Sequence, residues 1–352
     1  MKSLAKFALF SLLLTNTLFA GNDSTVPIHG FFDLDARYIG KENKSKLATG
    51  YLDFYITKSI SDKITVLMDV VFETKDDEYA VDIERINITY DVNEYLRITS
   101  GKFHSPYGYW NTAFHHGLQL QTSILRPKFL AFEDRGGVLP SHSVGIKATG
   151  NFDNLSYDFY VTSGVHIKNK DEEGGSFAGI ISTSNGEHQD GKKLFGATLA
   201  YDMEDTKIGL HSFYQNVNIF NQRSTDVLMS GAFIAMELER FELYSELYLF
   251  HNKNILGSTG DEYLFSKLFF AQAAYAFGNI KPYLRVETAH YNQSDFYFAA
   301  QSATAGFSYD RAALGIAYNI ADDATIKFAS IANKDKHKEA NYDFLAQFAV
   351  RF

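Results

Sequence analysis

Residues 341–352 read NYDFLAQFAVRF, and this stretch decides the fold. Its apolar residues occupy every second position: Tyr342, Phe344, Ala346, Phe348, Val350 and Phe352. The positions between them hold Asp343, Leu345, Gln347, Ala349 and Arg351. Because side chains two residues apart lie on the same face of a strand, one face is uniformly apolar and the other is mixed. Such a strand suits a wall between lipid and water.

The same alternation continues along the chain, for example in residues 64–73, 155–162 and 195–201. One face of each segment is apolar enough for lipid, which predicts a transmembrane β-barrel. A soluble β-sandwich also alternates. Its strands would be shorter, and more than 300 residues of β-structure would divide into domains joined by linkers, which the sequence does not show.

The connections between the expected strands alternate in length. Short turns are expected at residues 59–63, 91–94, 150–154, 202–206, 239–241, 277–279 and 321–324. Longer loops are expected at residues 40–48, 74–79, 104–142, 164–192, 216–225, 251–262, 292–310 and 333–340. Fifteen connections predict an all-β antiparallel barrel of about 16 strands, with both termini in the periplasm. The least certain boundary lies in residues 296–308, which could extend a neighbouring strand.

The first twenty residues have the composition of a secretory signal peptide. Lys2 and Lys6 precede an apolar run over residues 7–19, which ends at Ala20 before a polar segment. The alternative, a retained anchor, is disfavoured because the run is short for a bilayer core of about 30 Å. We therefore expect a signal peptide in residues 1–20 and a barrel in residues 21–352. Loss of the two lysines would change the net charge from −9 to −11.

Composition excludes several other classes. The chain has no cysteine, so a disulfide-stapled domain is excluded. No run of about 18 apolar residues follows residue 20, which excludes a bundle of transmembrane helices. A net charge of −9 disfavours binding to nucleic acid.

The last strand resembles that of the outer-membrane β-barrel proteins of Gram-negative bacteria, which ends in an aromatic residue preceded by alternating apolar residues. The resemblance implies a location in the bacterial outer membrane, in contact with its lipids. It also implies that Phe348, Val350 and Phe352 form an assembly signal for the barrel-assembly machinery.

Residues 104–142 interrupt the alternation and contain three of the five prolines and the only tryptophan, Trp110. A long loop this rich in apolar residues is expected to pack against the inside of the barrel. It is the third long loop and follows strand five, which resembles the sixteen-stranded porins, whose third loop folds into the lumen and sets the constriction. The resemblance implies a constriction formed by Arg126, Lys128, Glu133, Asp134 and Arg135.

A second resemblance is to the phosphate-selective porins. It rests on the step Gly101-Lys102-Phe103, which runs into the turn Pro106-Tyr107-Gly108. The alternation shows no clear ladder of inward arginines of the kind expected in that family.

The alternation also predicts which charged side chains face the lumen. The lumen wall is expected to include Arg37, Asp69, Arg85, Arg97, Lys147, Glu242, Glu246 and Arg285. Inward acids and bases are segregated onto different strands, which resembles the transverse field of general porins. The side chains of Lys58, Glu84, Lys102 and Lys267 point outward by the same alternation, here called outward parity. They are therefore expected near a rim of the barrel.

These features predict a porin for passive diffusion of small hydrophilic or charged solutes, with no catalytic step and no cofactor. Selectivity is expected to be weak, because an acidic fourth loop (Asp171, Glu172, Glu173) opposes a near-neutral or slightly basic constriction. The resemblance to porins suggests a homotrimer.

Four other interpretations remain open. The first is an anion- or phosphate-selective channel. The second is an outer-membrane hydrolase using Ser105 or Ser141 with a histidine and Asp134. The third is an adhesin or structural barrel. The fourth is a metal site at His104, His115 and His116 with the carboxylates of Glu133 and Asp134, although adjacent histidines on an extended chain point to opposite faces.

Overall fold

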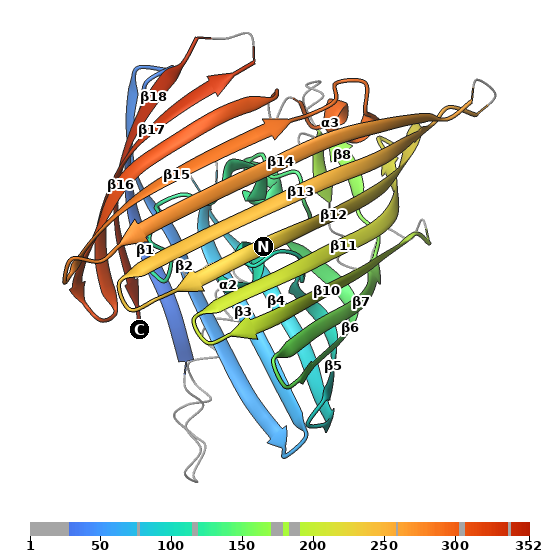
Figure 1. Cartoon of the computed structure of the whole chain (residues 1–352), viewed down its shortest axis with the longest axis horizontal. Coiled ribbons are helices and arrows are strands. Elements are labelled where there is room, and N and C mark those ends of the chain that lie inside the picture. Colours follow the sequence, from blue (N-terminus) through green and yellow to red (C-terminus); the bar gives the residue numbers. More distant parts are fainter. Residues whose placement is uncertain are drawn as a thin grey trace.

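The structure, a computed structural model, describes residues 28–75, 78–114, 119–169, 179–182, 191–257, 260–302, 307–336 and 339–352. Figure 1 shows the strands tilted around a lumen that holds the short helix α2. The first strands are β1 (Ile28–Ile39), β2 (Lys44–Ser61), β3 (Ile64–Lys75), β4 (Glu78–Asn93), β5 (Leu96–His104), β6 (His142–Phe152) and β7 (Leu155–Ser163). The others are β8 (His166–Asn169), β9 (Gly179–Ser182), β10 (Lys193–Met203), β11 (Thr206–Ile219), β12 (Arg223–Glu237), β13 (Phe241–Ile255), β14 (Glu262–Tyr275), β15 (Ile280–His290), β16 (Tyr309–Ala321), β17 (Ala324–Asp335) and β18 (Asn341–Arg351).

Sixteen of these eighteen described strands form one closed antiparallel wall. Strand β7 pairs with β10, and β1 pairs with β18, which closes the barrel. Strands β8 and β9 form a hairpin within the fourth loop, and β8 pairs in parallel with the end of β11. The predicted sixteen-stranded barrel is confirmed. No helix in the described residues is long and apolar enough to cross a bilayer.

The third loop has the predicted limits, since β5 ends at His104 and β6 begins at His142. Several other predicted loops are too long, because the flanking strands continue into them. Strand β13 runs to Ile255, inside the predicted loop 251–262, and β17 runs to Asp335, inside the predicted loop 333–340. Strand β2 begins at Lys44, so the first loop spans residues 40–43 rather than 40–48, and the fifth spans 220–222 rather than 216–225. Left-handed residues with φ between 50° and 55° (Asn43, Phe220 and Asn221) allow these tight turns. Residues 296–300 do not extend a strand, because they form the short helix α3 (Phe296–Ala300), and β16 begins only at Tyr309.

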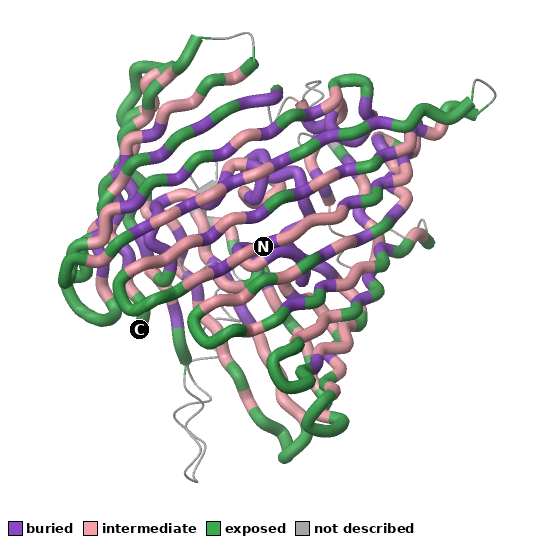
Figure 2. The backbone as a smooth tube through the Cα atoms, viewed as in Figure 1, coloured by how far each residue is buried: buried purple, intermediate pink, exposed green. Residues whose placement is uncertain are grey.

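The outer surface of the barrel is apolar. Burial alternates along each strand, which Figure 2 shows as bands on β13 to β16. Outward side chains such as Leu210, Leu314 and Phe344 are 64%, 63% and 53% exposed. A continuous apolar belt of this kind is stable only in contact with lipid, which agrees with a transmembrane barrel.

One outward prediction is wrong. Glu84 faces the interior, because a β-bulge in β4 leaves it as an extra residue between Ile83 and Arg85, which pair with Val70 and Asp69. This extra residue shifts the inward–outward alternation of β4 by one position. The Glu84 side chain is 10% exposed, and its carboxylate lies 2.5 Å from Nε2 of His142.

Candidate functional site: a loop across the lumen

The first limb of the third loop is anchored to β13 and β11. This limb contains α2 (Trp110–Ala113). The buried carboxylate of Glu246 on β13 accepts hydrogen bonds from the backbone N–H groups of Trp110 (2.6 Å) and Tyr109 (3.1 Å). The N–H of Gly108 donates to Nδ1 of His211 on β11. Glu246 therefore faces the lumen, as its parity predicts, and there it binds the loop.

The middle of the loop is anchored to β15 and β17. Arg285, 1% exposed, donates to the carbonyls of Leu125 (2.6 Å) and Arg126 (3.2 Å) and to Oγ of Ser123 (3.0 Å). Lys327 on β17 donates to the carbonyl of Gln121 at 2.7 Å. These buried cations satisfy carbonyls that have no partner within a helix or sheet.

Aromatic packing fills the space between the loop and one side of the wall. Trp110 of the loop lies edge-on to Phe270 of β14, with ring centroids 5.5 Å apart. Phe129 contacts Tyr248 of β13 at 5.5 Å. The same buried cluster includes Phe114, Leu130, Val138, Phe213, Tyr244 and Phe250. The aromatic cluster therefore fills the side of the lumen bordered by β7 and β10–β15. On the opposite side, the loop packs through Ile124 and Leu125 against a smaller apolar cluster from β14–β18.

Residues 126–135, here called the strap, cross the lumen between two tethers. At one end, Nζ of Lys128 lies 3.6 Å from Asp335 at the end of β17 and 4.3 Å from the ring centroid of Tyr309 on β16. At the other end, Arg135 donates to Glu73 of β3 at 3.0 Å and lies 4.5 Å from the ring centroid of Tyr51 on β2. The pore residues predicted from the sequence did not include Asp335. It fell within the expected loop 333–340, where no strand alternation indicates which way a side chain points.

Arg126 supports the strap from within. Its Nε donates to the carbonyl of Leu130 at 2.7 Å, and its Nη2 donates to Oδ1 of Asn111 at 2.8 Å. Burial lowers the pKa of the Arg126 guanidinium. Burial also lowers the pKa of Lys128, against the effect of Asp335, and raises that of Glu133, against the effect of His142. Glu133 accepts from the N–H of Ser141 at 2.6 Å, and the side chain of Asp134 lies outside the described part of the structure.

An opening of about 370 Å³, here called the eyelet, lies between the strap and the wall of β1 and β16–β18. Six basic side chains line it: Arg37, Lys41, Arg126, Lys128, Arg135 and Arg311. Three acidic side chains line it: Asp35, Asp335 and Asp343. A second opening of about 210 Å³ is lined by Gln119, Lys281, Asp322 and Arg351 near the turn that joins β16 and β17. Both openings lie on the side that the aromatic core leaves open.

The other predicted wall residues form pairs with their neighbours. Arg85 donates to Asp69 at 2.7 Å, and Arg37 pairs with Asp35. Lys147 lies 3.7 Å from Asp158, and Lys281 lies 3.0 Å from Glu242. Arg97 donates to Asp91 at 2.6 Å near the turn between β4 and β5. Acids and bases of the wall therefore neutralise each other locally, within a strand or between strands that lie close together, which weakens a field across the whole lumen.

Of the residues considered for metal or hydrolytic chemistry, His104, Ser105 and Ser141 lie at the base of the third loop. His104 and His142 are cross-strand partners, with ring centroids 5.6 Å apart. Oγ of Ser105 is 2.7 Å from Oγ of Ser143. His115 and His116, like the acidic residues 171–173, lie outside the described residues. In the described part of the chain, no group of three or more His, Asp or Glu side chains is arranged to hold a metal ion.

No family model and no curated protein matches the sequence. Solved structures do match the fold. An anion-selective porin from Comamonas acidovorans superposes with a TM-score of 0.64 and 13% identity over 93% of this chain and 99% of that chain. The outer membrane channel DcaP of Acinetobacter baumannii superposes with a TM-score of 0.60 and 11% identity over 95% of this chain and 100% of that chain. The trimer form of OmpT, an outer membrane protein of Vibrio cholerae, superposes with a TM-score of 0.60 and 11% identity over 93% of this chain and 99% of that chain. The chain therefore has the fold of the sixteen-stranded outer-membrane porins.

Proposed function

We propose that this protein is an outer-membrane channel through which small hydrophilic or charged solutes diffuse passively, without a catalytic step. The observation that supports this most directly is the strap, which lies inside the barrel beside the eyelet, where charged side chains gather. The aromatic core supports the loop from the other side of the lumen. A barrel that only displayed surface loops would not need this internal support.

Planar bilayers test the proposal. The full-length protein should give discrete ohmic conductance steps. A variant in which a short Gly-Ser turn replaces residues 105–141 should assemble and conduct more, because the strap is gone. A wild-type barrel that assembles but does not conduct would refute the channel function.

A preference for anions is the second candidate, because six basic and three acidic side chains line the eyelet in a chain whose net charge is −9. Charge at the narrowest region has more effect than charge at the mouth, since low-dielectric walls focus the field there. A phosphate-selective channel would be a special case of this preference.

Reversal potential under a KCl gradient tests the anion preference. Replacing Arg37 and Lys41 with glutamine should move it towards cations, while replacing Lys44 and Lys63, which lie outside the eyelet, should not. Equal shifts in the two variants would mean that overall charge sets the selectivity. Arg126 is unsuitable for this test because it supports the strap.

The homotrimer, the signal peptide in residues 1–20 and the assembly signal are part of the same proposal. One similar structure is described as a trimer form. Chemical cross-linking of the protein in native membranes should give a trimer, and N-terminal sequencing of the mature protein should begin at Gly21. Crosslinking that yields only monomer would remove the trimer from the proposal.

A further inference from the structure

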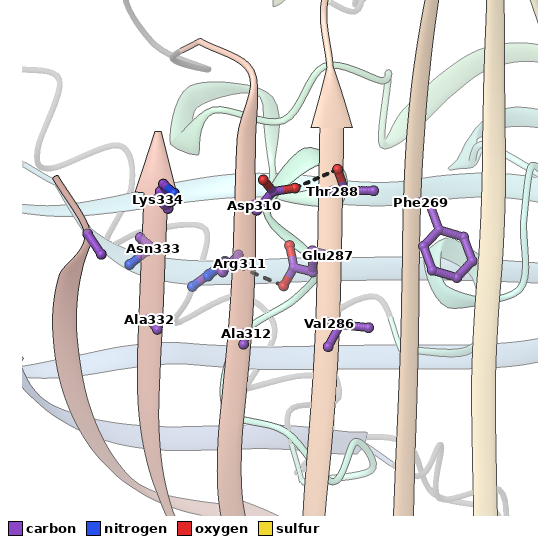
Figure 3. A pocket seen from close by; sticks show the side chains of 11 residues that line it. Phe269, Val286, Glu287, Thr288, Asp310, Arg311, Ala312, Ala332, Asn333 and Lys334 are labelled. Atoms are coloured by element: carbon purple, nitrogen blue, oxygen red, sulfur yellow. Dashed lines mark hydrogen bonds and ion pairs between the residues drawn. The ribbon is translucent and has the colours of Figure 1, made fainter. Parts of the chain in front are cut away.

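A hollow of about 500 Å³ lies on the outer wall of the barrel, across β14–β17. Figure 3 shows two of its rows, with Lys334, Asp310 and Thr288 above Ala332, Ala312 and Val286. These rows are in register, since Thr288 pairs with Asp310 and Asp310 with Lys334, while Val286 pairs with Ala312 and Ala312 with Ala332. Glu287, Arg311 and Asn333 fall between the rows and have the opposite, inward parity.

Small side chains form the floor of the hollow, and larger ones surround it. In the next row down, Leu284 and Leu314 are 52% and 63% exposed and project from the wall. Phe269 borders the hollow on the β14 side, and Tyr342, 57% exposed, pairs with Ala332 on the β18 side. The alanines therefore leave a depression in a surface that faces hydrocarbon.

The upper edge of the hollow is polar and carries excess positive charge. Oγ1 of Thr288 donates to Asp310 at 2.8 Å, and Lys334 is the cross-strand neighbour of Asp310. Lys267 and His290, which pair with each other, have the same outward parity one row above Phe269 and Thr288. Among the outward charged side chains of these two rows on β14–β17, Lys267 and Lys334 outnumber Asp310, so this edge attracts an anionic group.

The polar row lies at the boundary of the apolar belt. Asp310 and Tyr318 are both outward on β16 and eight residues apart. At about 3.4 Å per residue and a strand tilt of about 40°, this places them roughly 20 Å apart along the membrane normal. An apolar belt is about 25 Å tall with aromatic residues at its edges. With Tyr318 at one edge, the polar row therefore lies within about 5 Å of the opposite edge, and the alanine row lies deeper in the belt.

We propose that this hollow binds one phosphate-bearing lipid, with an acyl chain over Ala312 and Ala332 and the phosphate at Lys334 and Thr288. A bilayer-facing depression must be filled by an acyl chain or a protein surface, and the basic edge favours a lipid with an anionic headgroup. The inference is independent of conduction, because the site lies on the outside of the wall.

Native mass spectrometry of the detergent-solubilised full chain tests the site, with phosphatidylglycerol and phosphatidylcholine as probes. The wild type should retain one phosphatidylglycerol per chain. Ala332→Phe, which fills the hollow, should reduce retention at least tenfold. Ala148→Phe is the matched control, since it adds the same ring to the outward face of β6 beside the exposed Phe159 and should bind as the wild type does. Heat-modifiable migration establishes that each variant is assembled.

Lys334→Gln should weaken retention of phosphatidylglycerol about fivefold, the effect of one lysine at an anionic lipid surface, and leave that of phosphatidylcholine unchanged. Lys102→Gln, which removes an outward cation on β5, should have no effect. Equal retention by wild type and Ala332→Phe would refute the site.

A second copy of the chain is the competing occupant. Because the chain has no cysteine, Ser330→Cys on the outward face of β17 gives a single thiol at the hollow. Oxidation should leave this variant monomeric when denatured. A disulfide-linked dimer as the main product would assign the hollow to an interface between chains and overturn the lipid site.

Discussion

Arg285 shows how one lumen side chain acts as a structural support. Besides the loop groups, it donates to Glu287 at 2.9 Å, and both side chains are 1% exposed. The same Glu287 accepts from the backbone N–H of Lys128 at 2.7 Å. The pair therefore connects the wall to the loop on both sides of Arg126.

We expect Arg285→Gln to destabilise the third loop by about 3–5 kcal/mol, because it leaves Glu287 buried without its closest cation. The strand ladder should keep the barrel assembled. Hydrogen exchange of the amides in residues 119–130 measures the effect. Arg351→Gln is the matched control, since that arginine pairs with Asp323 at an exposed site, worth at most about 1 kcal/mol. Unchanged protection of the loop in Arg285→Gln would contradict this role.

Asp295 gives the seventh loop a pH dependence. It is the N-cap of α3, accepts from the N–H of Tyr297 at 2.9 Å and from Nδ2 of Asn252 at 2.8 Å, and is fully buried. Burial raises its pKa from 3.8 to about 6. Between these values the folded loop binds more protons than the unfolded one, so stability falls as pH rises from about 4 to about 6.

We therefore expect the amides of α3 to be most protected near pH 4 and least protected above pH 6. The free energy of opening the loop should therefore fall by roughly 3 kcal/mol at most over this pH range, at about 1.4 kcal/mol for each pH unit. Hydrogen exchange corrected for the intrinsic rate measures it. Asp295→Asn should abolish the dependence, and wild-type protection that is flat from pH 4 to 7 would count against the assignment.

Among the elements, the strap is held at each end by an ion pair that is partly exposed. The Lys128 and Asp335 side chains are 29% and 23% exposed, and the Arg135 and Glu73 side chains are 38% and 18% exposed. Exposed pairs contribute about 0–1 kcal/mol each. The tethers therefore position the strap, while the aromatic core and Arg126 hold it in the lumen.

Replacing both Lys128 and Arg135 with glutamine should leave the loop folded but increase its motion. We expect noisier open-channel current and a conductance change well below that of the loop deletion. The matched control is Lys253→Gln, which removes a partly exposed lysine that pairs with Asp226 and Asp261 at 3.4 and 3.1 Å near the end of β13. Current noise equal to that of the wild type would show that the tethers do not restrain the strap.

At the scale of the whole molecule, Phe352 closes the barrel. Its N–H donates to the carbonyl of Gly30 at 3.0 Å, and its carbonyl accepts from the N–H of Gly30 at 2.9 Å. Its ring contacts Phe54 of β2 at 5.8 Å. The last residue thus joins β18 to the first strand of the wall.

Deleting Phe352 should lower the yield of heat-modifiable barrel in cells several-fold without affecting export. Phe344→Ala is an informative control, because Phe344 and Phe352 are 53% and 52% exposed. If position in the terminal signal matters, Phe352→Ala should impair assembly and Phe344→Ala should not. Equal yields from these two alanine variants would show that only the lost apolar area counts.

The strands of the barrel wall could be predicted from local sequence patterns alone. A period of two specifies which side chains face lipid, and fifteen alternating connections specify sixteen strands, because both signals are local. The same patterns also placed the third loop between His104 and His142, since the alternation stops there.

The contacts inside the lumen depend on long-range packing and could not be predicted from these patterns. The alternation along each strand indicates that Glu246, Arg285 and Lys327 face inward. It does not indicate that the third loop covers them, because their partners Trp110, Leu125 and Gln121 lie 136 to 206 residues away in sequence. One bulged residue reverses parity, which turned Glu84 inward. The eyelet likewise depends on which half of the lumen the aromatic core fills, and long-range packing sets that.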